Sequence, residues 1–70
     1  MTLFDGAQGI EHKIKNINTN DRELDSFLFS LGCYSGEPIT VISRNKNGCV
    51  VSLKDARYSI DTRLARAIEI

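Results

Sequence analysis

Residues 31–42 read LGCYSGEPITVI, and this stretch is the most informative about the fold because one kind of element ends in it and another begins. Gly32 directly follows an apolar stripe with helical spacing, at a position where glycine commonly takes the left-handed conformation that ends a helix. From Pro38 onward apolar and polar residues alternate, which is typical of a β-strand. Ser35 and Gly36 fit a type II turn between the two. The stretch therefore predicts a helix, a tight corner and a strand.

The predicted helix runs from Asp21 to Leu31. Four apolar residues share one helical stripe, which we expect to face a core: Leu24, Phe27, Leu28 and Leu31. At the start of the helix, Asn20 followed by Glu23 fits a capping box, with Asn in place of the usual Ser or Thr. Phe29 is outside the stripe.

Short strands are predicted on both sides of this helix. They cover residues 9–17, 38–44, 49–53, 56–60 and 67–70. The first strand needs a bulge or twist near Lys15 and Asn16, because Ile10 and Ile14 lie on one face and Ile17 on the other. These elements predict a small, mainly β barrel of five strands, with one helix after the first strand, because closure removes open sheet edges.

Three turns connect the later elements. Asn47-Gly48 is typical of a hairpin with a type I′ turn. Lys54 and Asp55 turn the chain again, and Asp61 is expected to cap one short helical turn before the last strand. No repeat or linker interrupts this order, so we expect a single domain over residues 1–70.

Size and composition argue against an enzyme. Domains of this length bury only about 60% of the surface that their unfolded chain exposes. The 41% hydrophobic content is therefore needed for the core, which leaves little for a deep, walled active-site pocket. We expect no enzymatic activity.

Charge and hydropathy limit the partners. Nine basic residues balance nine acidic ones, whereas proteins that bind phosphates usually carry a basic excess, so nucleic acid is not the expected partner. A stripe of Lys13, Lys15, Arg44 and Lys46 on one face would instead favour a nucleic-acid-binding barrel. No apolar run reaches the length of a membrane helix, and the first residues do not resemble a signal peptide. We expect a cytoplasmic protein without direct membrane insertion.

The residues that most often bind metals are few. His12 is the only histidine, and the two cysteines, Cys33 and Cys49, form no CxxC motif. We expect two reduced, buried thiols, a surface or strand-edge histidine, and no metal or cofactor. A sensor or carrier of iron or zinc that uses Cys33, Cys49 and His12 stays open as an alternative.

Several apolar residues have no obvious core role, namely Leu3, Phe4, Phe29 and Tyr34. Exposed aromatic residues that cluster in space mark protein contacts. Phe29, Tyr34 and Phe4 are therefore the candidate partner contacts.

The pattern resembles the FeoA family of bacterial ferrous-iron transport proteins. The resemblance covers nearly the whole chain and rests on these residues: Gly9, Ile14-x-x-Ile17, Arg22, Leu24 through Leu31-Gly32, Gly36-x-x-Ile39-x-Val41-Ile42, Ile60, Ala65, Ala67-Ile68 and Ile70. It implies an SH3-like barrel with a helix inserted after the first strand. It also implies a non-enzymatic, cytoplasmic accessory protein that binds the cytoplasmic part of the FeoB GTPase-permease and modulates Fe(II) uptake, with no metal ligand or catalytic residue to transfer. Its oligomeric state stays open.

The chain departs from this family at the corner. Members usually place proline before the second glycine, where this chain has Ser35, and a small aliphatic residue after the first, where it has Cys33. Ser35 leaves the unfolded chain less restricted than proline would, at an expected cost of about 0.4–1 kcal/mol. The changed surface at residues 33–35 bears on which partner contacts this chain makes.

Overall fold

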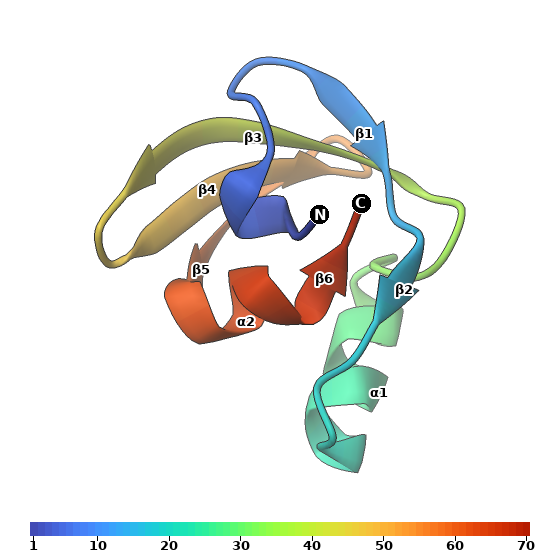
Figure 1. Cartoon of the computed structure of the whole chain (residues 1–70). Helices are drawn as coiled ribbons and strands as arrows, with labels where there is room; N and C mark the ends of the chain where they lie inside the picture. Colours follow the sequence, from blue (N-terminus) through green and yellow to red (C-terminus); the bar gives the residue numbers. More distant parts are fainter.

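The computed structural model describes residues 1–70 and consists of two antiparallel sheets with helices packed at their ends (Figure 1). The elements follow this order: a 3₁₀ helix η1 (Leu3–Asp5), β1 (Glu11–Lys13), β2 (Asn16–Ile17), α1 (Arg22–Ser30), β3 (Pro38–Asn45), β4 (Gly48–Leu53), β5 (Ala56–Asp61), α2 (Thr62–Ala67) and β6 (Ile68–Glu69). The predicted fold is confirmed: the protein is mainly β, with one helix after the first strands and a short helix before the last.

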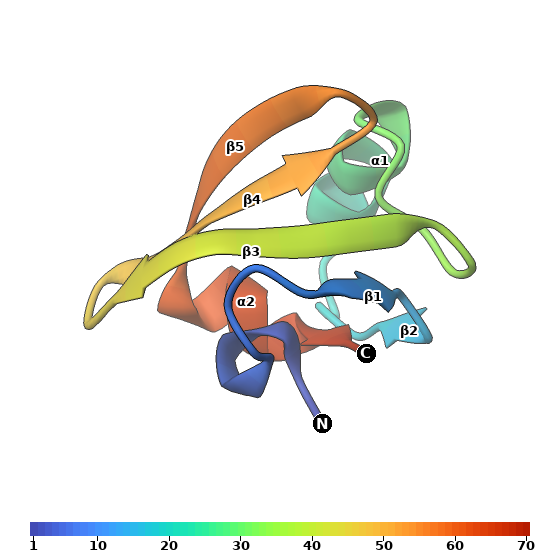
Figure 2. The same ribbon diagram turned by 90° about the horizontal axis from the view of Figure 1, so that it is seen from above.

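The larger sheet has the strand order β1-β3-β4-β5, and β2 pairs with β6 in a separate two-stranded sheet. The predicted five strands are thus six, in two sheets that do not close into one barrel, and β5 forms the outer edge of the larger sheet, beyond β4 (Figure 2). The N- and C-terminal segments run close together, since Ile70 donates its backbone N–H to the carbonyl of Met1.

The first predicted strand is two strands, which corrects the expectation of one bulged strand. Between β1 and β2 the backbone N–H of Ile14 bonds the carbonyl of Glu37, and that of Lys15 bonds the carbonyl of Glu69. The chain therefore passes from one sheet to the other at this point. Ile14 is buried while Ile10 is 54% exposed, so these two residues do not share a core face as predicted.

Twelve apolar side chains from every part of the chain form one core. They are Leu3, Ile14, Leu28, Cys33, Ile39, Val41, Cys49, Val51, Leu53, Ala65, Ile68 and Ile70. The alternation predicted for β3 is confirmed, because Ile39 and Val41 are among them. Leu3 was predicted to lack a core role, which is wrong: η1 folds it inward and leaves it 0% exposed.

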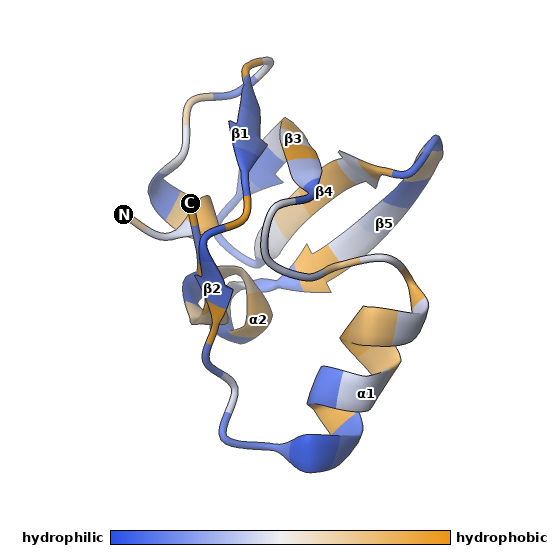
Figure 3. Ribbon diagram, turned by 90° about the vertical axis from the view of Figure 1, so that its right-hand side faces the viewer, coloured by the Kyte–Doolittle hydropathy of each residue, from blue (hydrophilic) through white to orange (hydrophobic).

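Helix α1 projects from the body of the protein and carries apolar residues along its length (Figure 3). It begins one residue later than predicted, because Asp21, rather than Asn20, is the cap whose side chain accepts from the N–H of Leu24. Leu28 is buried, but Phe27 is 57% exposed. The predicted stripe is therefore only partly a core face: Leu28 and Leu24 pack against the core, and Phe27 lies in the solvent.

The corner after α1 is confirmed. Gly32 has φ +89°, and the N–H of Cys33 bonds the carbonyl of Leu28 at 2.9 Å, which closes the helix end. Gly36 has φ +91° and follows Ser35 in a turn that the N–H of Glu37 closes onto the carbonyl of Tyr34. These two turns fix the direction in which Tyr34 leaves the helix.

The type I′ turn predicted for the first hairpin occurs instead in the second. In the first, Asn45 pairs with Gly48, so Lys46 and Asn47 are the central residues, and neither has a positive φ. The Asn47-Gly48 type I′ turn was therefore wrongly placed. In the second hairpin Lys54 (φ +52°) and Asp55 (φ +64°) both take the left-handed conformation, which is the type I′ geometry.

Candidate functional site

An aromatic pair, of which Phe29 is exposed and Tyr34 half-buried, joins the end of α1 to the corner that follows it. The ring centroids of Phe29 and Tyr34 lie 5.0 Å apart with the planes tilted by 35°. Tilted pairs at this separation are favourable beyond the area they bury. Phe29 nevertheless stays 66% exposed, so the structure brings together two of the three predicted contact residues on the surface.

The corner holds Tyr34 against Phe29 through its buried and hydrogen-bonded neighbours. Cys33 is part of the core and anchors the residue just before Tyr34. On the other side, the Ser35 hydroxyl donates to the carbonyl of Lys15 at 2.9 Å. The departures from the family pattern at positions 33 and 35 therefore support the placement of Tyr34, a role that sequence reasoning missed.

A charged pair borders the aromatic pair. The ammonium of Lys54 lies 5.7 Å from the centroid of the Tyr34 ring and forms an ion pair with Glu37. A hydrogen bond from Lys54 lowers the pKa of Glu37 most, and one from Tyr34 lowers it further. The bond to Glu37 in turn raises the pKa of Lys54. The aromatic surface thus has one polar side, as the rim of a protein interface usually does.

Next to the aromatic pair lies a shallow groove of about 200 Å³. Its lining residues come from β2, α1 and the corner: Asn16, Ile17, Asp25, Phe29, Cys33, Tyr34 and Ser35. Four of these residues, Ile17, Phe29, Cys33 and Tyr34, are apolar, and Asp25 is the only charged one. The groove is the size of one or two side chains, so it fits a protein contact better than a bound metabolite.

Phe4 lies apart from this surface. It belongs to η1, which packs near α2 on a different side of the molecule from α1 (Figures 1 and 2). Its ring is partly buried against the core, and the guanidinium carbon of Arg66 lies 5.2 Å from the ring centroid. A partner contact at Phe4 stays a prediction and would be separate from the Phe29–Tyr34 pair.

The candidate metal ligands do not converge. The structure holds no group of three or more His, Cys, Asp or Glu side chains placed to bind a metal ion. Cys33 and Cys49 are both free and buried, as predicted. Burial raises the pKa of the Cys33 thiol to about 11 and also raises that of Cys49, whereas a metal ligand needs the thiolate. His12 is on the edge strand β1, with its Nε2 buried and unpaired.

Arg44, one of the four residues of the proposed basic stripe, is engaged in hydrogen bonds within the protein. The Arg44 guanidinium donates to the carbonyl oxygens of Phe4 and Gly6, at 2.5 and 2.6 Å. It therefore fastens η1 to β3 and does not project freely toward a phosphate backbone. This weakens the nucleic-acid alternative.

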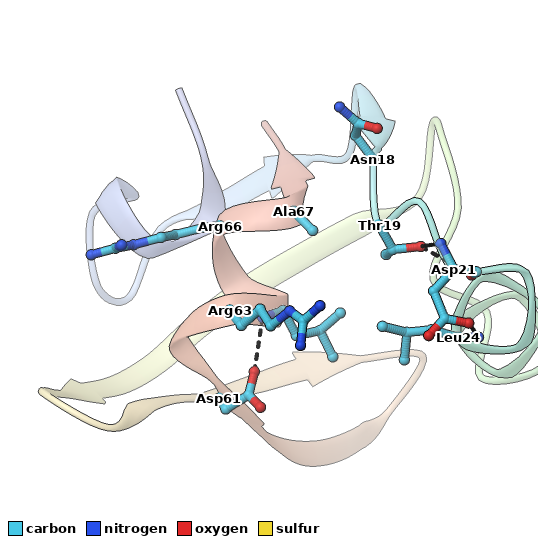
Figure 4. A pocket seen from close by; sticks show the side chains of 9 residues that line it. Asn18, Thr19, Asp21, Leu24, Asp61, Arg63, Arg66 and Ala67 are labelled. Carbon is cyan, nitrogen blue, oxygen red and sulfur yellow. Dashed lines mark hydrogen bonds between the residues drawn. The ribbon is translucent and has the colours of Figure 1, made fainter.

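The largest pocket, of about 380 Å³, separates the start of α1 from α2. Arg63 projects into it from α2, whereas Arg66 points away toward η1 (Figure 4). The carboxylates at its rim are already used: Asp21 and Asp61 cap α1 and α2 by accepting from the N–H groups of Leu24 and Leu64. Capping explains both acids, so they do not indicate an acid–base pair.

None of the helices is long and apolar enough to cross a membrane.

Solved structures similar to this chain share its fold at low sequence identity. An iron uptake regulatory protein, FeoA, aligns over 97% of this chain and 91% of its own, with a TM-score of 0.85 and 23% identity. Iron(II) transport protein A from Clostridium thermocellum aligns over 99% of this chain but only 43% of its own, with a TM-score of 0.86 and 24% identity. FeoA of Stenotrophomonas maltophilia, a prokaryotic SH3 domain protein in complex with zinc, aligns over 99% and 87%, with a TM-score of 0.84 and 15% identity.

The predicted SH3-like class is thereby confirmed. No curated protein matches the chain. The FeoA domain family, however, matches it over residues 1–70. The chain therefore belongs to the FeoA family.

Proposed function

We propose that this protein is a non-enzymatic accessory module that binds the cytoplasmic part of a FeoB GTPase-permease and thereby modulates Fe(II) uptake. Membership of the FeoA family supports a role in ferrous-iron transport, and that family is not a known enzyme family. The Stenotrophomonas maltophilia protein has been suggested to act as a bacterial ferrous-iron transport activating factor. In this proposal the protein acts on the cytoplasmic side of the membrane.

The observation that carries the proposal is the Phe29–Tyr34 pair beside the groove, in which the Phe29 ring is exposed. Aromatic residues are enriched at the centre of protein interfaces because they bury a large area with few rotatable bonds. Phe29 keeps about two thirds of its surface in water, which is unfavourable unless another surface covers it. An apolar side chain of FeoB would lie in the groove against Phe29 and Tyr34.

The charges around the pair would set the orientation of the partner. Asp25 lines the groove, and the Lys54–Glu37 ion pair borders Tyr34. A basic side chain of FeoB that flanks its apolar anchor would reach Asp25. Such rim charges change the association rate and its salt dependence more than the affinity.

A transport assay with a matched control tests the proposal. Phe27 and Phe29 are on the same helix, are similarly exposed, and differ in that only Phe29 contacts Tyr34. In cells that lack their own copy of this protein, Phe29→Asp should fail to restore Fe(II) uptake and Phe27→Asp should restore it. Full restoration by Phe29→Asp, at equal protein level, would contradict the proposed contact.

A further inference from the structure

Strand β5 leaves an open and unusually regular sheet edge. It is the last strand in the order β1-β3-β4-β5 and runs for six residues, Ala56–Asp61, in unbroken register with β4. The opposite edge strand, β1, has only three residues. Natural proteins usually protect such an edge with a bulge, a proline, charged side chains or a covering segment. Strand β5 contains no bulge and no proline, and its two charged residues, Arg57 and Asp61, are of opposite sign.

The hairpin geometry determines which backbone groups face outward. Leu53 and Ala56 flank the two-residue Lys54-Asp55 turn, so they form a hydrogen-bonded pair, and pairs of this kind alternate along the ladder. Ala56, Tyr58 and Ile60 therefore direct their N–H and C=O groups toward β4. Those of Arg57 and Ser59 point away from β4, and neither residue takes part in any backbone bond outside the regular elements.

The side chains on the outer face of β5 are complementary to themselves. Arg57, Ser59 and Asp61 are all exposed on this face. If a second β5 pairs antiparallel about a twofold axis at Ser59, Ser59 lies opposite its own copy. Arg57 of each chain then lies opposite Asp61 of the other, close enough for an ion pair. The Asp61 side chain caps α2 with Oδ1, and its second oxygen is free to accept from the arginine.

The inner face fits the same pairing. Tyr58 and Ile60 are only partly buried against the core, and in this register each would lie opposite the other residue of the second chain. Aromatic and β-branched residues placed opposite each other stabilise antiparallel strands. A register slipped by two residues toward the turn would instead place Asp61 opposite Asp55, which is unfavourable. The charges thus favour one register.

We propose that β5 is a homodimerisation edge, through which two copies of this chain form one continuous eight-stranded sheet centred on Ser59. The interface is a short strand pair, so the dimer would be weak and concentration-dependent. This surface includes neither Phe29 nor Tyr34.

Sedimentation equilibrium of the whole protein up to 1 mM, compared between variants, tests this inference. The wild type should reversibly form dimers. Ser59→Pro removes an N–H that the β4 ladder does not use, so it should leave the fold intact and weaken dimerisation at least about tenfold. Arg57→Glu should also weaken dimerisation, because the new carboxylate would lie opposite Asp61 of the second chain. The control Lys13→Glu makes the same charge change on the opposite edge of the sheet and should dimerise like the wild type.

Amide hydrogen exchange locates the interface in the same samples. Exchange at Ser59 should slow as the protein concentration rises, whereas Tyr58, which is bonded to β4, should be protected at every concentration. A wild type that stays monomeric at 1 mM would overturn the proposal, and so would a dimer that Ser59→Pro leaves unchanged. If the wild type is monomeric and Ser59→Pro weakens binding of the FeoB cytoplasmic region, the edge accepts a strand of FeoB and self-pairing is wrong.

Discussion

The ring of Phe29, on the last turn of α1, lies 5.0 Å from the ring of Tyr34, on the far side of the Gly32 turn. The stretch between them contributes one buried side chain, Cys33, to the core. The corner therefore does two things: it ends the helix, and it holds an aromatic residue against the exposed end of that helix. Two residues that the sequence separates by five positions become one surface.

Ser35 is expected to be nearly equivalent to the proline found in most family members. Ser35→Ala loses the hydrogen bond to the carbonyl of Lys15 and should lower the free energy of unfolding by about 0.5–1.5 kcal/mol. Ser35→Pro loses the same bond but restricts the unfolded chain, which returns about 0.4–1 kcal/mol. Urea denaturation of both variants should therefore place Ser35→Pro above Ser35→Ala. Since both variants lack the bond, the reverse order would show that proline strains the turn.

Cys33 should make the protein less stable at alkaline pH. Burial disfavours the charged thiolate and raises the pKa of Cys33 from 9.0 to about 11. As the pH rises, Cys33 therefore loses its proton in the unfolded chain before it does so in the folded protein. The stabilising contribution is complete below about pH 9 and is lost as the pH rises from 9 toward 11. Thermal unfolding across this range should show a smaller pH-dependent loss for Cys33→Ala than for the wild type.

The same burial predicts low reactivity of both thiols. In the folded protein at pH 8, a disulfide reagent should modify Cys33 and Cys49 slowly, and in denaturant both should react at the rate of a free thiol. Rapid modification of the folded protein would mean that the corner opens readily. It would contradict the claim that the buried Cys33 holds Tyr34 in place.

Asp21, not Asn20, should be the residue whose loss weakens α1. Asp21→Ala removes the acceptor for the N–H of Leu24 and should lower the free energy of unfolding by about 0.5–2 kcal/mol. Asn20 has φ +59°, a conformation that glycine adopts without strain, so Asn20→Gly should be neutral or slightly stabilising. Circular dichroism during thermal unfolding compares the two, and a larger loss for Asn20→Gly would indicate that the capping box forms in solution.

The sequence predicted the corner and most elements because local chemistry determines them. The left-handed glycine, the alternation of β3 and the Asp61 cap depend on neighbouring residues alone. The split of the first strand depends on hydrogen bonds to Glu37 and Glu69, which are distant in the sequence and give no local signal. Leu3 similarly became a core residue through tertiary contacts.

The candidate site was predictable only in part. The helical periodicity placed Phe29 outside the core stripe, but it also placed Phe27 inside it, which is wrong because Phe27 is 57% exposed while Leu24 and Leu28 pack against the core. The contact between Phe29 and Tyr34 could not be predicted from the sequence, because it depends on the geometry of the turns at Gly32 and Gly36. The roles of Ser35 and Lys54 could not be predicted, because they depend on contacts with the carbonyl of Lys15 and with the ring of Tyr34 that only the folded chain forms.

The affinity of this protein for the purified cytoplasmic region of FeoB, measured by titration calorimetry, is the decisive measurement for the proposed function. The wild type should bind, Phe27→Asp should bind with a similar Kd, and Phe29→Asp should weaken binding at least about tenfold, because truncating an aromatic anchor at the centre of an interface typically has this effect. Absence of binding by the folded wild type at tens of micromolar, or equal affinities for Phe29→Asp and the wild type, would refute binding through the Phe29–Tyr34 pair.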